Sequence, residues 1–109
     1  MVMRVVGECI IATGAASTLT IGEADVSDLY SIEFAVKVGT PLAGTTAVTA
    51  IPKNGTSETV TDGFGAAVNI NPTALTGFTI SGRPLKSLTF TPTSWTDGVQ
   101  IVATAWGRF

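Results

Sequence analysis

The side chains that could take part in catalysis are few, and their spacing does not form an active-site pattern. The chain has no histidine, which removes the Ser-His-Asp and Cys-His nucleophile systems and the usual zinc ligands. Cys9 is the only cysteine, so we interpret it as a small buried hydrophobe on the first strand. Ser87 and Lys86 are neighbours in a strand-like segment, where consecutive side chains point to opposite faces, so this pair would not meet.

The densest group of acidic residues could in principle hold a metal ion through carboxylate oxygens. It consists of Glu23, Asp25 and Asp28, and it lacks the Asp/Asn/Gly spacing of a calcium loop. We therefore predict no metal and no cofactor, and we expect Asp25 and Ser27 to shape the start of the next strand through side-chain to backbone bonds. The eight acidic residues do not exclude a pair of carboxylates for glycoside hydrolysis, but so small a domain rarely provides the cleft that such enzymes need. We predict that the protein is not an enzyme.

Aromatic side chains near the carboxyl end are better candidates for a functional surface. In the segment VQIVATAW the apolar residues Val99, Ile101, Ala103 and Ala105 share one face, and Trp106 falls on the other, with Gln100, Val102, Thr104 and Arg108. The candidate protein-interface residues are Trp95, Trp106, Arg108 and Phe109. Of the two tryptophans, Trp106 is the better candidate for contact with another chain, and Trp95 for covering the end of the domain. The alternative, that both rings pack within their own domain, stays open because tryptophan is highly buried on average.

The elements that must position these residues are strands. Apolar and polar residues alternate from end to end, and turn residues separate the alternating segments. In SIEFAVKV the alternation directs Ile32, Phe34, Val36 and Val38 to one side. Asn54-Gly55 is typical of a two-residue hairpin loop, and all five prolines fall at strand edges. The predicted strands cover residues 5–12, 18–21, 31–38, 46–51, 66–70, 77–80, 86–91 and 99–106. Residues 22–30 could instead hold a single helical turn.

This pattern predicts one all-β domain over residues 1–109, a single β-sandwich. A jelly-roll strand order is preferred, and an immunoglobulin-like order is the alternative. Only 13% of the residues are charged, against roughly 25% in an average soluble domain. The net charge of −2 and the lack of a basic run argue against nucleic-acid binding. No apolar run could span a membrane, and Glu8 interrupts the only stretch that resembles an export signal, so we expect a cytoplasmic protein.

Two stretches resemble small β-sandwich structural proteins of tailed bacteriophage virions. These are ADVSDLYSIEFAVKVGTPLAGTTAVTAIPKNG and LKSLTFTPTSWTDGVQIVATAW. The resemblance implies a capsid decoration or cement protein that binds and stabilises the phage head. Its partners would be the major capsid protein or other virion proteins, and it would form a dimer or trimer. It would be located in the virion, and in the host cytoplasm during assembly.

A binding module of a phage tail or head fibre, for carbohydrate or a receptor, is the alternative function. In that case Trp95, Trp106 and Tyr30 would stack on sugar rings, which requires at least two aromatic rings on one exposed face.

Overall fold

The computed structural model describes residues 2–22, 29–40, 43–55, 57–60, 67–73, 77–81 and 84–108. None of these residues is in a helix, so the described part of the chain has no helix that could cross a membrane. They form nine strands, which are β1 (Met3–Ala12), β2 (Ser17–Thr20), β3 (Leu29–Val38), β4 (Thr45–Pro52), β5 (Glu58–Thr59), β6 (Asn69–Ile70), β7 (Phe78–Ser81), β8 (Leu85–Thr93) and β9 (Gln100–Arg108).

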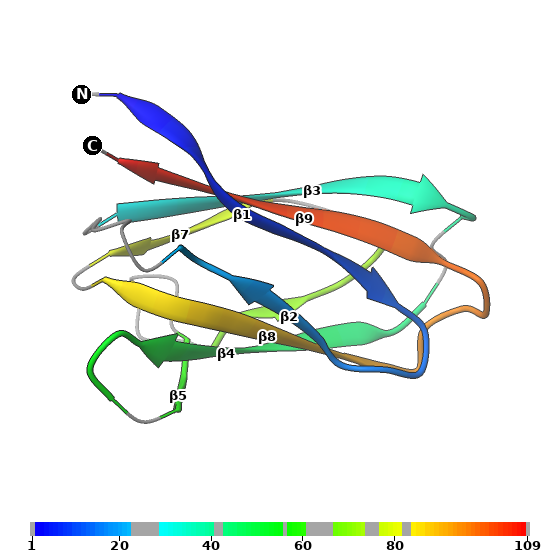
Figure 1. The fold of residues 1–109 in the computed structure, drawn as a ribbon. Coiled ribbons are helices and arrows are strands. Elements are labelled where there is room, and N and C mark those ends of the chain that lie inside the picture. The colour runs from blue at the N-terminus through cyan, green and yellow to red at the C-terminus, as the bar shows by residue number, and fades with distance from the viewer. Residues whose placement is uncertain are drawn as a thin grey trace.

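The strands form two antiparallel sheets that pack face to face, which confirms the predicted β-sandwich (Figure 1). One sheet has the order β1-β9-β3-β7. The other has the order β2-β8-β4-β5, and β6 also pairs with β4. The last strand, β9, therefore lies between β1 and β3, and Figure 1 places the amino- and carboxyl-terminal strands side by side.

The core lies between the two sheets and follows the alternation of the sequence. In β9, Val99 before the strand and then Ile101, Ala103 and Ala105 are all buried, as predicted. Two aromatic contacts extend the core within and between the sheets. Phe34 of β3 stacks on Phe78 of β7 with ring centroids 5.9 Å apart, and it meets Phe90 of β8 edge-on at 6.0 Å.

One hydrogen bond ties the sheets together inside this core. The backbone N–H of Leu85, at the start of β8, donates to the hydroxyl oxygen of Tyr30 in β3 over 3.0 Å. Both residues are buried, and Tyr30 has no exposed surface. A buried tyrosine usually pairs its hydroxyl, and here the partner is the backbone N–H of the first residue of β8.

The structure differs from the sequence-based prediction at one turn and at one β-bulge. Asn54 and Gly55 do not form a two-residue hairpin loop, because neither has a positive φ and the ladder of β4 with β5 closes only at Ala50 and Glu58. The two-residue β5 was also not predicted. In β3, a β-bulge between Val36 and Val38 breaks the predicted common face, since it sets Val38 opposite Gln100 on the outside of the sheet.

Four of the five prolines lie within described residues, at or next to strand ends: Pro52, Pro72, Pro84 and Pro92. Pro41 lies outside the described residues. So does the predicted acidic group with its possible helical turn, since residues 23–28 are not described.

Candidate interaction surface

The outer face of the sheet β1-β9-β3 carries Trp106 and Arg108, and the strand register places their neighbours. Residues opposite each other in antiparallel strands share a face. Four rows therefore cross the three strands. The Trp106 row is Val5, Trp106 and Ser31, the glutamate row is Glu8, Thr104 and Glu33, the Ile10 row is Ile10, Val102 and Ala35, and the last row is Ala12, Gln100 and Val38. Met3 lies opposite Arg108 beyond the Trp106 row.

Large apolar side chains are exposed on this face. Val5 is 50% exposed, Ile10 is 40% exposed and Val38 is 46% exposed. On the central strand β9, Val102 and Trp106 are half-buried between their neighbours on β1 and β3. An exposed apolar patch on a small soluble protein marks an interaction surface more often than scattered single residues do.

The acidic residues of this face are confined to one row. Glu8 and Glu33 flank Thr104 from the two neighbouring strands, and both are exposed. Adjacent strands lie about 4.8 Å apart, so the two glutamates stand about 10 Å apart on either side of a single intervening strand. Arg108 supplies positive charge on the same strand as Thr104, two rows away and on the same face.

A bulge in β1 shapes the edge of this face. The register shifts between Val5 and Gly7, and β1 then runs close to β2. A Cβ atom on Gly7 would lie 2.6 Å from the carbonyl oxygen of Thr20 and 2.7 Å from the side chain of Leu19, so only glycine fits there. Farther along, the hydroxyl of Ser17 donates to the carbonyl of Ile10 over 2.7 Å. The bulge, and the side-chain hydrogen bond to a backbone carbonyl of β1, hinder a further strand from pairing with this edge. The outer face of the sheet is therefore a better contact surface than its edge.

Trp106 has an unusual environment for a tryptophan. Its indole Nε1 atom is buried, and no hydrogen-bond acceptor for it occurs within the described part of the chain. The side chain is thus partly open to solvent, and its one polar group has no hydrogen-bond partner among the described residues. An unpaired buried donor destabilises the isolated chain by about 1–3 kcal/mol.

The other candidate residues do not extend this face. Trp95 is only 8% exposed and belongs to the core, where it closes one end of the sandwich. Tyr30 is fully buried. The three aromatic rings that would form a sugar-binding platform are therefore not brought together. Phe109 lies outside the described residues.

The remaining chemical groups are separate from one another. Cys9 lies on the first strand and packs against the core, as predicted, but it is half-buried rather than buried. Burial, and secondarily the negative charge of Glu8, raises the pKa of its thiol from 9.0 to about 11. A thiol with so high a pKa is a poor nucleophile near neutral pH. Within the described ranges, no three His, Cys, Asp or Glu side chains come together as a metal site would require.

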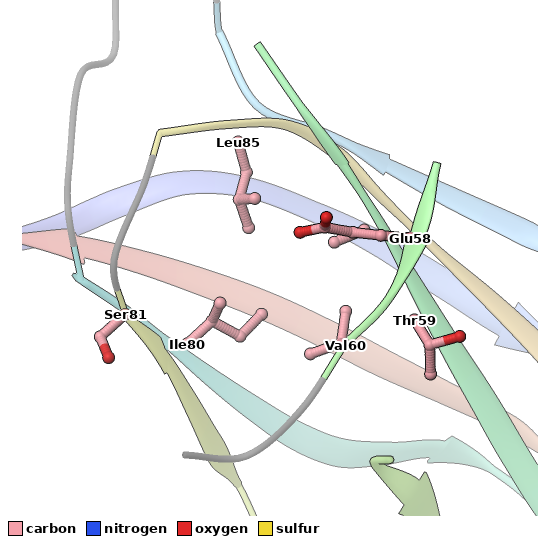
Figure 2. Close-up of a pocket in the computed structure, with 7 residues that line it drawn as sticks. Glu58, Thr59, Val60, Ile80, Ser81 and Leu85 are labelled. Carbon is pink, nitrogen blue, oxygen red and sulfur yellow. The ribbon is translucent and has the colours of Figure 1, made fainter. Parts of the chain in front are cut away.

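A small pocket opens at one edge of the sandwich, between β5, β7 and the start of β8 (Figure 2). Its volume is about 110 Å³, below the roughly 300 Å³ at which small-molecule sites begin. In Figure 2 the side chains of Val60, Ile80 and Leu85 point inward with the carboxylate of Glu58, whereas the hydroxyl groups of Thr59 and Ser81 point away. One carboxylate beside three apolar side chains does not form a catalytic pair.

Reasoning from the sequence identified one strand of the candidate surface but not its two neighbours. Alternation placed Trp106 and Arg108 on the outside of β9, and the structure agrees. The contributions of Val5, Ile10 and Glu33 depend on which strands flank β9, and local periodicity carries no information about strand order. No protein-family model, curated protein or solved structure matches the chain.

Proposed function

We propose that this protein is a non-enzymatic structural protein of a tailed-bacteriophage virion, of the capsid decoration or cement type. The observation that carries the proposal is the outer face of β1, β9 and β3, where Val5, Ile10 and Val38 are exposed and Val102 and Trp106 are half-buried. A protein that binds a shell needs a rigid fold and a low-charge contact face, and interface cores are depleted in charge. The major capsid protein or another virion protein would cover the part of this face around Ile10, and several copies on one particle would bind through avidity.

The alternative of a carbohydrate-binding module receives less support from the same side chains. Stacking on sugar needs two or more aromatic rings on one exposed face, and Tyr30 and Trp95 are buried. The pocket beside Glu58 is too small for a sugar residue and its neighbours. The exposed apolar side chains of Val5, Ile10 and Val38 on the outer face favour contact with another protein.

The test of the proposal begins with the position of the gene and ends with the particle. The gene is expected next to that of a major capsid protein, and particles purified from that phage should contain the protein in many copies by mass spectrometry. Particles that lack it should release DNA at a lower temperature, and purified protein added back should restore the higher temperature. Absence of the protein from purified particles would refute the proposal, as would a gene neighbourhood without virion genes.

A further inference from the structure

The charges on the outer face of β1, β9 and β3 indicate a specific partner. We propose that this face binds a second copy of the same chain, with a two-fold axis along the Trp106 row, so that Arg108 of each copy docks between Glu8 and Glu33 of the other. The inference does not depend on a role in a virion. It rests on the register of the strands and on the positions of the charged residues.

A two-fold axis that stacks this face on the same face of a second copy must lie in the plane midway between the two facing sheets, one from each copy. If the axis runs along the strands, every row faces itself, so that Arg108 faces Arg108 and the carboxylates of Glu8 and Glu33 face each other. If it runs along the glutamate row, four carboxylates meet. Like charges placed opposite each other disfavour both arrangements.

An axis along the Trp106 row gives the opposite result. Trp106 then faces Trp106 of the second copy, and the strand position of Arg108 faces Thr104. Because Glu8 and Glu33 flank Thr104 on the neighbouring strands, the guanidinium reaches a site with one carboxylate on each side. The arrangement is repeated by symmetry, so each copy contributes one cation and two anions. Arginine is suited to such a site because its planar fork of donors can bond more than one carboxylate oxygen.

One further axis, along the Ile10 row, is the main competitor. It would place the glutamate row against Ala12, Gln100 and Val38, and only Lys37, in the bulge beside Val38, could approach a carboxylate. Glu8 would then be covered without a cation. The axis along the Trp106 row pairs both glutamates, and for this reason we prefer it.

The size of the overlap sets the strength of the contact. Three rows cover about 20 Å along the strands and about 15 Å across them, or roughly 300 Å² of each copy. Stable complexes bury about 800 Å² per partner, so we expect a concentration-dependent dimer rather than a permanent one. The Ile10 row lies outside the overlap and stays available to a different partner.

The test uses charge reversal and recombination of two variants. The Arg108→Glu variant and the Glu8→Lys/Glu33→Lys double variant should each be monomeric, because each places like charges against one another. An equimolar mixture should form a heterodimer, because both of its charge sites are again complementary. Sedimentation equilibrium from about 10 µM to about 1 mM covers weak association. We expect each reversal to raise the dissociation constant tenfold or more, and added salt to weaken the wild-type dimer.

Lys37→Glu is the matched control, because it reverses a charge on the same sheet outside the proposed overlap. It should leave the dissociation constant unchanged. Circular dichroism and urea denaturation check that each variant is folded. If Arg108→Glu is unstable, the Glu8→Lys/Glu33→Lys variant tests the same contact by itself, because both glutamates are exposed. A wild-type protein that stays monomeric throughout the concentration range would overturn the inference. A mixture that fails to associate, or a dimer disrupted by Lys37→Glu but not by Arg108→Glu, would also overturn it.

Discussion

The indole N–H of Trp95 donates to the backbone carbonyl of Thr45 over 3.0 Å, and this bond fixes the ring across the end of the sandwich. Trp106, eleven positions later, has a buried N–H without an acceptor within the described residues. The two tryptophans therefore have different roles. One completes the core, and the other lies on a face that a second molecule can cover.

Replacement of each tryptophan by alanine should separate these roles. Trp95→Ala removes a buried ring and its hydrogen bond, and we expect a loss of about 3–5 kcal/mol in the free energy of unfolding. Trp106→Ala should cost below about 2 kcal/mol, because a half-exposed ring contributes less to the core. Urea denaturation at low protein concentration measures both. If Trp106→Ala unfolds the monomer instead, the ring belongs to the core and cannot be an interface residue.

The hydrogen bond between Tyr30 and Leu85 predicts a measurable contribution to stability. Tyr30→Phe keeps the ring but leaves the backbone N–H of Leu85 buried without this acceptor. We expect a loss of about 1–3 kcal/mol in the free energy of unfolding. Thr91→Val removes a hydroxyl from an exposed position of β8 and should change stability by less than about 0.5 kcal/mol. Equal effects of the two substitutions would show that the bond between the sheets contributes nothing.

Two glycines with positive φ should respond differently to alanine. Gly14 has φ +84° and open space around it, so Gly14→Ala should cost only the backbone strain of about 1 kcal/mol. Gly44 has φ +100°, and a Cβ atom there would lie 2.7 Å from two carbonyl oxygens and from the ring of Trp95. Gly44→Ala should therefore cost about 1–3 kcal/mol more, which thermal denaturation can measure. Similar midpoints for both variants would contradict the crowding at Gly44.

The thiol of Cys9 should give stability a pH dependence in the alkaline range. Burial raises its pKa to about 11 in the folded protein, so the unfolded chain loses this proton first as the pH rises. The contribution of the thiol to stability is present below pH 9 and is lost as the pH rises through the folded pKa. The difference in stability between wild type and Cys9→Ala should fall between about pH 9 and pH 11. Alkylation of the native thiol by iodoacetamide should rise with a midpoint near pH 11, and a midpoint near 9 would contradict the shift.

Local alternation was sufficient to predict the fold class and most strands, because a strand with one face in the core carries a period of two. It placed Ile101, Ala103 and Ala105 inside and Trp106 outside correctly. It was wrong where backbone geometry departs from a regular strand. The bulge in β3 turns Val38 outward, and the turn at Asn54 and Gly55 adopts negative φ values despite its typical sequence.

The candidate surface was harder to predict than the core. Its rows join residues from β1, β9 and β3, which are far apart in the sequence, and only the register of the strands brings Glu8 and Glu33 to either side of Thr104. The strand order depends on long-range packing, which leaves no mark in the local pattern of any one segment. The sequence thus predicted which residues of β9 point outward. Which residues of β1 and β3 lie beside them became known only from the structure.

The central position of β9 has a consequence for how the chain folds during synthesis. Met3 pairs with Arg108, and β3 pairs with the other side of the same last strand, so neither pairing can form until β9 has left the ribosome. Until then β1 and β3 expose unpaired edges, and such edges are prone to aggregation. Because these contacts join distant parts of the chain, folding should be slow for a domain of this size. Removal of residues 100–108 should therefore leave a chain that accumulates on chaperones or in inclusion bodies.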